Sequence, residues 1–491
     1  MLIGIDDTDS RKGMCTTYLC AVLVSEFREA GLSVSLPYLV RLNPCIPQKT
    51  RGNGAVCIDV SAPGRANWEE YVKKRVISRI EELAFVEDEN THPGAVFAYD
   101  AALEEIRNDR KKCEKLLRFY ERAVKGVLEL EDALCVISEL NLEYFKMKSG
   151  RGLIGALAAV SFAFAQKYEL QGRQESTDAH FSSRKSSCSS VFASERNDLT
   201  YELLAYREKE RWGTPREIEE ESVWNADKAT YPLTWDTVDV KNRKIVFAPH
   251  SPCPVLFGIR GDSIPAILKA ARMIRSEPIA LEMLFVTNQG TDAHLLEFCS
   301  EAKELKDYHS YIIDGVVVRE PRNIAGGHVV FSIAVQEDTQ KQEQEEERKK
   351  EKSQERCESQ LIDCIAYEPT KQFRDVVRKL RIGDEVTVFG SFKRNTVNLE
   401  KMLVRSVVRS VERNPRCPVC GKRMESAGRG QGFRCKRCKT HKAERESEPL
   451  KRDLEEGFYE VPPVARRHIS KPLVRMREDA EKFGFKIFPS R

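Results

Sequence analysis

The stretch "GIDDTDSRKGMCTTY", residues 4–18, places three carboxylates directly after a short apolar strand: Asp6, Asp7 and Asp9. An apolar helical run then opens near Thr16. Carboxylates this close repel one another unless a cation lies among them, and Mg²⁺ binds one or two carboxylates together with water and phosphate oxygens. The N–H groups at a helix start also favour a phosphate. The stretch therefore predicts a site for Mg²⁺ and phosphate; the alternative is a turn in which these residues only cap the helix.

Two further loops have the composition of a phosphate site. "NPCIPQKTRGNGAV" (43–56) sets a lysine and an arginine beside glycines, which let a backbone approach a ligand closely. "KSGRGLIGA" (148–156) is a glycine-rich start of a helix, again suited to an anion. The chain lacks the GxxxxGK[ST] motif of P-loop NTPases. The candidate phosphate-binding residues are Lys49, Arg51, Gly150, Arg151 and Gly152.

Length and composition limit the class of protein. A chain of 491 residues is too long for one hydrophobic core, and it predicts three to four domains. Its 41% hydrophobic and 32% charged residues fit a soluble globular protein. No signal peptide or run of roughly 18 apolar residues is visible, so we expect a cytoplasmic protein without membrane contact. Fifteen scattered cysteines, an odd number, then predict reduced thiols, with any clustered ones held for metal.

Two CxxC pairs form the most specific motif: Cys417 with Cys420, and Cys435 with Cys438. Two such pairs complete a tetrahedral zinc site and leave no open position for water, so the metal would be structural. The alternative is disulfide pairing. Residues 414–491 hold 20 Lys and Arg against 11 Asp and Glu, a net charge of +9, while the whole chain carries +4. This basic end indicates a phosphate-rich partner, the alternative being a solvated charged surface.

The pattern of strands, helices and breaks predicts a multidomain α+β protein. Five short strand-like runs and one helix fit an OB-fold barrel, and a charged run within it contains no hydrophobic residue that could be buried. The expected units are a nucleotide-binding unit at 1–170, a Ser-rich insertion or linker at 171–198, a small α+β sandwich at 199–306, the barrel at 307–413 with its charged run at 336–356, and a zinc ribbon with a basic tail at 414–491.

Several motifs follow one another in an order met in one family. They are "GIDDTDSRKGMCTTYL", "RLNPCIPQKTRGNGAV", "SGRGLIGALAA", "PVLFGIRGDS", "TNQGTDAHL" and "GFYEVPPVARRHISKPLVR". Together they resemble the archaeal agmatidine synthetases, the tRNA-isoleucine 2-agmatinylcytidine synthetase family, over nearly the full chain. The resemblance implies a kinase-like N-terminal domain, a ferredoxin-like domain, an OB-fold and a Cys₄ zinc ribbon.

The resemblance also implies an activity. The family joins agmatine to the 2-carbonyl carbon of the wobble cytidine in isoleucine tRNA with a CAU anticodon, consuming ATP to AMP, so that the anticodon reads AUA. Asp6, Asp7 and Asp9 would hold Mg²⁺ on the nucleotide. Thr16 aligns with the family's autophosphorylated threonine. The implied partners are this tRNA and agmatine, and the oligomeric state stays open.

Agmatine needs hydrogen-bond acceptors for its guanidinium group. The loops around "APHSPCPVLFGIRG" and "TNQGTDAH" offer backbone carbonyls and polar side chains that we expect to face the first domain. His250 and His294 could each act as a base, but a histidine in a loop is more often only hydrogen-bonded. The candidate agmatine-binding residues are His250, Gly258, Arg260, Gly261, Asn288, Gln289 and Asp292.

Two other functions compete with an ATP-dependent tRNA ligase. One is a non-catalytic nucleic-acid-binding protein with an OB-fold and a zinc ribbon, which has no need for an acidic loop that collects Mg²⁺. The other is an ATP-dependent kinase or synthetase acting on a free small amine, which has no need for the basic C-terminal module. ATP turnover that depends on tRNA separates all three.

Overall fold

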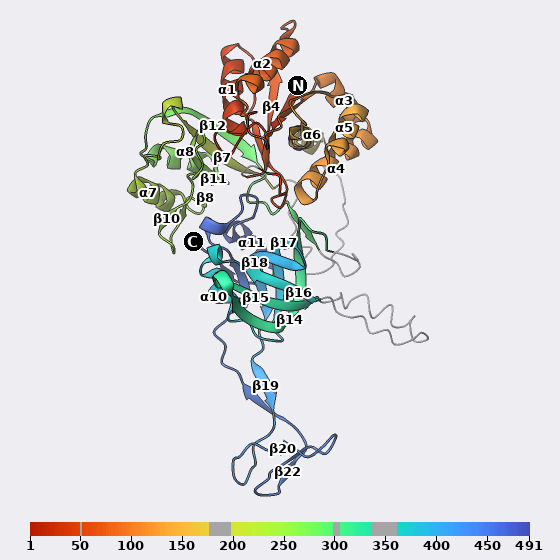
Figure 1. The fold of residues 1–491 in the computed structure, drawn as a ribbon, viewed down its shortest axis with the longest axis vertical. Helices are drawn as coiled ribbons and strands as arrows, with labels where there is room; N and C mark the ends of the chain where they lie inside the picture. The colour runs from red at the N-terminus through yellow and green to blue at the C-terminus, as the bar shows by residue number, and fades with distance from the viewer. Residues whose placement is uncertain (50–51, 176–197, 298–304, 336–360) are drawn as a thin grey trace.

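The computed structural model describes residues 1–49, 52–175, 198–297, 305–335 and 361–491. Arg51, the charged run 336–356 and most of the Ser-rich segment lie outside the described residues. Figure 1 shows a helix-covered sheet, a barrel and a slender extension following one another along the long axis. Among the helices described, none has the length and apolarity needed to cross a membrane. The predicted mixed α/β multidomain architecture is thus confirmed.

A ten-stranded sheet joins the first half of the chain. Its order is β6 (Glu143–Lys146), β5 (Gly94–Ala98), β1 (Leu2–Asp6), β4 (Gly54–Ser61), β3 (Tyr38–Arg41), β12 (Ile279–Thr287), β7 (Thr200–Arg207), β11 (Val255–Gly261) and β8 (Thr234–Trp235), with β2 (Ser33–Val34) beside β4. The parallel pairing of β3 with β12 joins two segments that are distant in the sequence. The two units that the sequence suggests at 1–170 and 199–306 therefore share one sheet, a link that no local pattern indicates.

Helices cover both faces of this sheet. On one face, α1 (Thr16–Glu29) and α2 (Trp68–Leu83) pack with residues such as Ile3 and Ile5 in one hydrophobic cluster. On the other face, a second cluster contains α3 (Asp100–Asn108), α4 (Arg110–Lys125), α5 (Leu130–Glu139) and α6 (Gly152–Glu175). Beside β7 and β11, α7 (Glu220–Thr230) and α8 (Ile264–Met273) form a third cluster. Successive residues of β1 point to opposite faces of the sheet, so the strand packs against a layer of helices on each side.

Glycines let α6 lie against the end of β1. A Cβ atom at Gly4 would come within 2.0 Å of the Ala156 carbonyl oxygen, and one at Gly155 within 1.9 Å of Asp6 Oδ2. At Gly152 a Cβ atom would lie 2.6 Å from the Asp6 carbonyl oxygen. These contacts leave no room for any larger residue, so the helix start sits directly beside the acidic loop.

A closed barrel follows the sheet. Its ring consists of β14 (His309–Ile324), β15 (His328–Val335), β16 (Leu361–Ala366), β18 (Thr396–Ser406) and β17 (Glu385–Lys393), which pairs back with β14. β13 (Leu295–Glu297), β24 (Gly457–Glu460) and β25 (Ile487–Phe488) extend it, and the short α10 (Phe373–Val377) packs on its core. The one helix that the sequence predicts in the barrel is therefore short. In the preceding unit, the run "KIVFAPH" contributes only the short strand β10 (Lys244–Ile245), paired with β9 (Val238–Asp239).

The slender extension is an insertion between neighbouring strands. β18 and β24 pair in the barrel, and the chain between them leaves along a two-stranded stalk of β19 (Ser410–Arg413) and β23 (Glu446–Pro449). At its end lies a small sheet of β20 (Glu425–Ser426), β21 (Phe433–Arg434) and β22 (His441–Lys442). Figure 1 shows this extension projecting away from the barrel. The two ends of the insertion lie side by side in the barrel sheet, so the extension is connected to the barrel through the stalk.

Residues 457–491, the C-terminal clasp, return from the extension and connect the barrel to the large sheet. Arg466 pairs with Asp236 beside the sheet and, at 2.8 Å, with Glu460 of β24, and all three side chains are buried. The loop after β12 donates three backbone N–H bonds to carbonyls of His468 and Ile469. The clasp also includes α11 (Arg477–Lys482). Several basic residues of the tail therefore pair with carboxylates inside the protein.

Glu400 shows how strongly the clasp is tied to the barrel. Its carboxylate lies 3.0 Å from Arg467 Nη1 and 3.0 Å from His294 Nε2. Burial alone would raise the pKa of Glu400, but Arg467 and His294 lower it to about 2. Lys401 similarly contacts Asp292. These buried charges are compensated only while the clasp, barrel and sheet are joined.

We expect Arg466→Met to destabilise the protein far more than a surface substitution. Removing one partner of a buried ion pair costs about 3–5 kcal/mol, because the remaining carboxylates stay buried without it. The matched control is Arg409→Met, whose exposed pair with Glu456 contributes about 0–1 kcal/mol. Urea denaturation followed by tryptophan fluorescence measures both. Equal losses of unfolding free energy would contradict this role of the clasp.

Candidate active site

The acidic loop opens into a cavity of 370 Å³. Its wall combines the loop after β1, residues of 42–49 and 52–54 between β3 and the start of β4, the connection from α4 to α5, and the start of α6. Four groups of predicted residues meet here: Asp6, Asp7 and Asp9; Lys49; Arg151; and Gly152. The structure thus brings together three stretches that the sequence places up to about 150 residues apart.

Burial and mutual repulsion set the charge of the carboxylates. Burial, followed by the proximity of Asp7, raises the pKa of Asp6 well above its ordinary value. Burial also raises the pKa of Asp7 to about 6, although Arg151 opposes the shift. Arg151 Nη2 lies 2.9 Å from Asp7 Oδ2, and Asp7 itself has a left-handed φ of 58°. Such a crowded group of carboxylates is suited to a cation.

The remaining predicted phosphate residues differ in position. Lys49 lines the cavity and donates to the Pro44 carbonyl oxygen, while burial lowers the pKa of its ammonium group. Gly150 is not part of the lining; its φ of 74° makes the turn that precedes α6, and a side chain there would collide with Lys146. Arg51 is among the residues not described. Gly150 therefore shapes the helix start and Lys49 faces the cavity.

One side of this cavity is apolar, a feature that the sequence analysis missed. The apolar lining residues come from four elements: Leu42, Ile46, Val127, Leu128, Leu130 and Ile154. An apolar wall beside charged groups fits a ligand that has a planar base and phosphates. No sequence pattern marks these residues, because they are spread over two loops and two helices.

A second cavity, of 640 Å³, adjoins the first. Asp9, Gly52 and Gly54 line both. Thr16 lies on the wall of the second cavity at the first turn of α1, where its Oγ1 accepts a hydrogen bond of 3.1 Å from Thr8 Oγ1. The residue that caps α1 is Cys15, so capping does not explain Thr16. Thr16 thus lies on the wall of the second cavity and outside the lining of the first.

Three of the residues predicted to bind agmatine line the second cavity: His250, Gly258 and Arg260. Gly258 is required by packing, because a Cβ atom would lie 2.8 Å from Glu202 Oε1. Gly261 is not among the lining residues; a Cβ atom there would lie 2.3 Å from the Leu233 carbonyl oxygen of the neighbouring segment. The sequence therefore identified one wall of this cavity.

The other predicted residues are buried outside both linings. Asn288 exchanges hydrogen bonds with the backbone of Arg41, and Gln289 Nε2 donates to Glu202 at 2.5 Å. Asp292 contacts Lys401, and His294 contacts Glu400. These side chains join the sheet to its neighbours or hold a lining residue in place.

Two buried carboxylates of the second cavity were not anticipated. Glu202 lies on β7, 3.4 Å from Arg260 Nε and 3.7 Å from Arg41 Nη2, and Asp236 lies after β8 beside Arg466. Each of these carboxylates thus has a guanidinium group beside it: Arg260 and Arg41 at Glu202, and Arg466 at Asp236. The apolar part of the wall includes Leu39, Leu204, Phe247 and Val255. The cavity can therefore take an aliphatic chain with positive ends.

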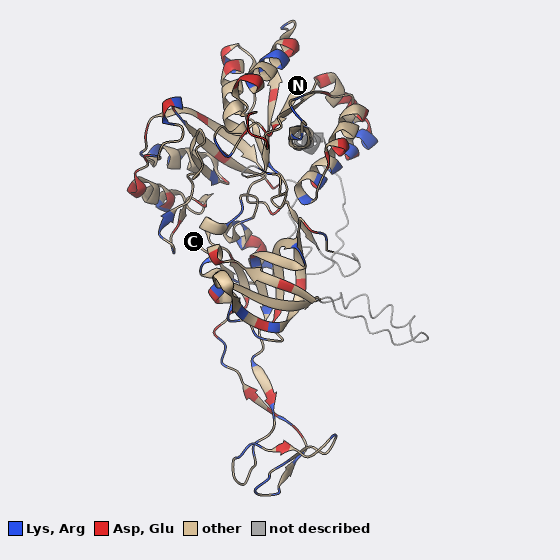
Figure 2. Cartoon of the chain, in the orientation of Figure 1, with Lys and Arg blue, Asp and Glu red and all other residues tan. Residues whose placement is uncertain are grey.

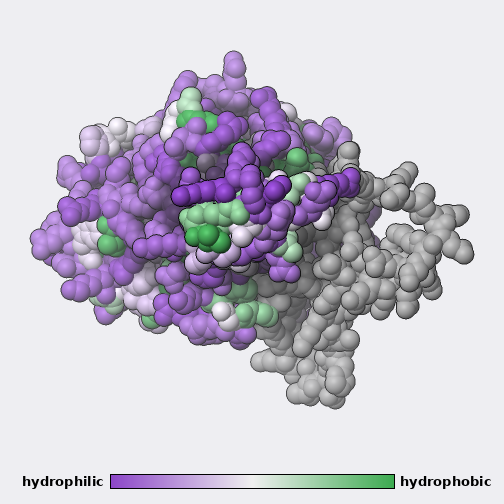
Figure 3. All heavy atoms as spheres, turned by 90° about the horizontal axis from the view of Figure 1, so that it is seen from below, coloured by the Kyte–Doolittle hydropathy of each residue, from purple (hydrophilic) through white to green (hydrophobic). Residues whose placement is uncertain are grey.

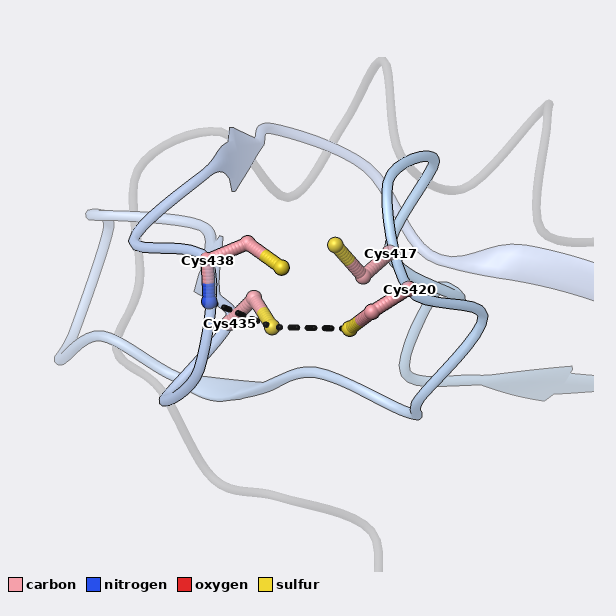
Figure 4. Close-up of side chains that lie close together, drawn as sticks. All are labelled: Cys417, Cys420, Cys435 and Cys438. Atoms are coloured by element: carbon pink, nitrogen blue, oxygen red, sulfur yellow. Dashed lines mark hydrogen bonds between the residues drawn. The ribbon is translucent and has the colours of Figure 1, made fainter.

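Four cysteines converge at the end of the extension (Figure 4). Their Sγ atoms lie within 4.8 Å of one another, and Cys420 Sγ is 3.6 Å from Cys435 Sγ. A disulfide bond joins sulfurs at about 2.05 Å, whereas zinc–sulfur bonds of about 2.3 Å hold four sulfurs at separations like those seen. The set Cys417, Cys420, Cys435 and Cys438 thus fits one tetrahedral zinc ion.

Positive charge surrounds these cysteines. Figure 2 shows basic segments along the loops of the extension, alternating with acidic ones. Arg423 pairs with Glu448 and Lys436 with Glu425, while Arg429, Arg434 and Arg437 lie at exposed positions. Seen from this end, the molecular surface is mostly hydrophilic with small hydrophobic patches (Figure 3). Such a surface is suited to an RNA backbone.

Family models match three ranges of the chain. The TiaS TCKD domain matches residues 2–149, the TiaS FLD domain 150–294 and the TiaS C-terminal zinc ribbon domain 414–454. The last match and the cluster of four cysteines confirm the zinc ribbon predicted from the two CxxC pairs.

Close relatives cover the whole chain. The isoleucine-tRNA 2-agmatinylcytidine synthetase TiaS of Methanosarcina acetivorans is 45% identical over 100% of both chains, and that of Archaeoglobus fulgidus is 44% identical over 96% of this chain and 97% of its own. Two crystal structures of TiaS complexes, one with its isoleucine tRNA and ATP and one with that tRNA, AMPCPP and agmatine, match with a TM-score of 0.73 each. Their identities are 44% and 40%, over 97% of both chains. The chain therefore belongs to the TiaS family of isoleucine-tRNA 2-agmatinylcytidine synthetases.

Proposed function

We propose that this chain is a cytoplasmic ligase that joins agmatine to the 2-carbonyl carbon of the wobble cytidine in isoleucine tRNA with a CAU anticodon, consuming ATP to AMP. The family of the chain supports the reaction. The observation that carries the proposal is the pair of adjoining cavities, which share Asp9, Gly52 and Gly54 and have Thr16 on the wall of one. One cavity suits a nucleotide and the other a chain-like cation.

In the first cavity, Asp6, Asp7 and Asp9 would hold Mg²⁺ on the phosphates of ATP. The metal ion, when bound, neutralises charge on phosphate oxygens. Arg151 and Lys49 supply further positive charge, and the start of α6 supplies N–H groups for an anion. The apolar wall would contact a planar base. Arg51 stays a candidate for the same role on the strength of its loop alone.

In the second cavity, Glu202 and Asp236 are the best-placed acceptors for the charged ends of agmatine, and His250 and Arg260 lie beside them. The apolar wall would contact the aliphatic chain. Gln289 would not contact agmatine but would position Glu202 through its hydrogen bond. Asn288 would likewise position Arg41. Asp292 and Gly261 support the fold around the cavity.

The chemistry requires activation of the base. A carbonyl oxygen of cytosine is a poor leaving group, so the γ-phosphoryl group of ATP is first transferred to it, which breaks the bond between the β- and γ-phosphates and leaves ADP. Formation of AMP then requires transfer of the β-phosphoryl group to a second acceptor, such as water. The primary amine of agmatine, after losing a proton, attacks carbon 2; the bond from carbon 2 to oxygen then breaks, and the oxygen leaves with phosphate. Thr16 would accept a phosphoryl group in its own right, since it lies on the wall of the cavity that adjoins the first one. The target base must leave its stack to reach them.

We also propose fold labels for the units. Residues 1–170 would form a kinase-like domain, 199–306 a ferredoxin-like domain, and 307–413 an OB-fold, with 414–491 as zinc ribbon and tail. The five-stranded ring of the barrel supports the OB-fold. The layer of α7 and α8 beside β7 and β11 supports an α+β sandwich.

The direct test incubates the protein with Mg²⁺-ATP, labelled agmatine and the CAU-anticodon isoleucine tRNA. We expect label at the wobble position and formation of AMP, both requiring all three components. Asp7→Asn should lower this turnover by at least ~100-fold, because it removes charge that holds Mg²⁺ while keeping the side chain's shape. Asp479→Asn, on the distant α11, is the matched control.

The outcomes separate the competing functions. ATP consumption without labelled RNA would point to a small amine as the substrate. Tight tRNA binding without ATP consumption would favour a binding protein. If Asp7→Asn kept full turnover, the first cavity would not be the nucleotide site.

Removal of zinc should separate RNA binding from phosphoryl transfer. Cys435→Ser removes one of the four thiolate ligands, so we expect the protein to lose zinc, which metal analysis measures. We also expect tRNA binding to weaken by at least ~10-fold. Phosphorylation of Thr16 should stay near the unaltered level, because the ribbon is attached only through its stalk. Cys135→Ser, an exposed cysteine on α5, serves as control. Loss of Thr16 phosphorylation together with zinc would show that the two parts depend on each other.

A further inference from the structure

A third cavity, of 240 Å³, lies on the barrel. Its wall includes Ser391, Phe392 and Lys393 at the end of β17, and Thr396 and Asn398 at the start of β18. These residues flank the loop between the fourth and fifth strands of the five-stranded ring. OB-fold barrels use this loop to bind oligonucleotides. None of the roles assigned above involves this cavity.

The lining of this cavity differs in charge from the other two. It contains the rings of Tyr308, Tyr367 and Phe392 and the cations of Lys393 and Arg467, and no carboxylate among the residues described. Lys393 Nζ lies 5.0 Å from the centroid of the Tyr308 ring, and Tyr367 is 40% exposed. The first and second cavities, in contrast, are each lined by several carboxylates. Aromatic rings beside cations are the means by which proteins hold unstacked bases and their phosphates.

The cavity is built rather than accidental. Arg467 Nη2 donates to Ser391 Oγ at 2.9 Å, and Nη1 lies 3.0 Å from Glu400 Oε1. Asn43 donates to the Tyr308 carbonyl oxygen at 2.9 Å, which fixes the backbone that carries the ring. The volume is below the roughly 300–1,000 Å³ of sites for drug-sized ligands, so it suits one base and not a whole cofactor.

One loop separates this cavity from the nucleotide cavity. Pro44 and Cys45 line the barrel cavity, while Leu42, Ile46 and Lys49 of the same loop line the first cavity. A base that enters the first cavity therefore has its sequence neighbours close to the barrel cavity. Those neighbours are unpaired nucleotides of the anticodon loop.

We propose that the barrel cavity binds the base of a nucleotide adjacent to the wobble cytidine, stacked on Tyr308 with its phosphate near Lys393. This inference rests on the proposed function, because it takes the wobble base to reach the nucleotide phosphates at the first cavity. The barrel then contacts the anticodon loop itself, a role that the sequence analysis did not foresee. Holding the neighbouring base would keep the wobble base unstacked and in place.

The test is a binding cycle with full-length isoleucine tRNA, measured without ATP or agmatine. Three RNAs are compared: the intact tRNA and two in which the nucleotide 5′ or 3′ of the wobble cytidine is abasic. For the unaltered protein we expect one abasic position to weaken binding by at least about fivefold, the loss of one stacked base. For Tyr308→Leu we expect intact tRNA to bind as weakly as the abasic tRNA binds to the unaltered protein. The same abasic position should not weaken binding to Tyr308→Leu any further.

Two more variants complete the cycle. Lys393→Met should lower the slope of log affinity against log salt by about 0.7, the value for one phosphate contact on a single strand. Tyr144→Leu removes a tyrosine that is 46% exposed on the distant edge strand β6 and should change nothing. Thr16 phosphorylation, followed in each variant, shows that the protein remains folded.

Each outcome decides the inference. Equal abasic effects in the unaltered protein and Tyr308→Leu, or no abasic effect in either, would overturn it. Agmatine transfer to intact tRNA is measured in parallel. If the unaltered protein transfers agmatine but the abasic effect does not depend on Tyr308, the role of the barrel cavity is rejected and the proposed function stands. Failure of the unaltered protein to bind this tRNA would overturn both the inference and the proposed function.

Discussion

The contact between β1 and the start of α6 is the constraint on which the candidate site depends. Three glycines bring a helix backbone against the end of a strand that carries a run of carboxylates. Burial of Asp6 and Asp7 is unfavourable for their charged forms, as their raised pKa values show. The positive end of α6 and the guanidinium group of Arg151 partly offset this. The fold thus holds an incompletely neutralised site, which in the proposed function a metal ion and phosphates would complete together.

The C-terminal clasp has a comparable role at the level of domains. Because the zinc ribbon is inserted between two paired strands, the chain must return to the barrel after it. On its return it contacts both the barrel and the large sheet, through Arg466 and Arg467. The wall of the second cavity includes Arg466 and His468 of this segment. A cavity between the first two units is therefore closed by residues from the far end of the sequence.

The sequence predicted the parts of the site that lie within one short stretch. The acidic loop, the glycine-rich helix start and the two CxxC pairs each combine their chemistry locally, so spacing reveals them. Glu202 could not be found in this way, because a glutamate in the middle of the strand-like run "TYELLAYR" has no local sign of its role. Asn288 and Asp292 were expected at the ligand because their loop is polar, yet these groups satisfy neighbouring buried backbone and charge. Parallel pairing of β3 with β12 brings Asn288 to the backbone of Arg41, and docking of the barrel brings Lys401 to Asp292; only the folded chain shows either contact.

Charge also separates the two substrates of the proposed reaction. Agmatine is a cation and can pair with a carboxylate, whereas the first cavity, lined by five carboxyl groups and two cationic side chains, disfavours RNA phosphates unless a metal ion is bound. A cytosine base is neutral, so it can enter an acidic cavity if its phosphates remain outside. The backbone must then be held by cations elsewhere, and the structure offers them on the zinc ribbon and around the barrel cavity. An extruded base is therefore the form of the RNA substrate that this distribution of charge admits, and a duplex is not.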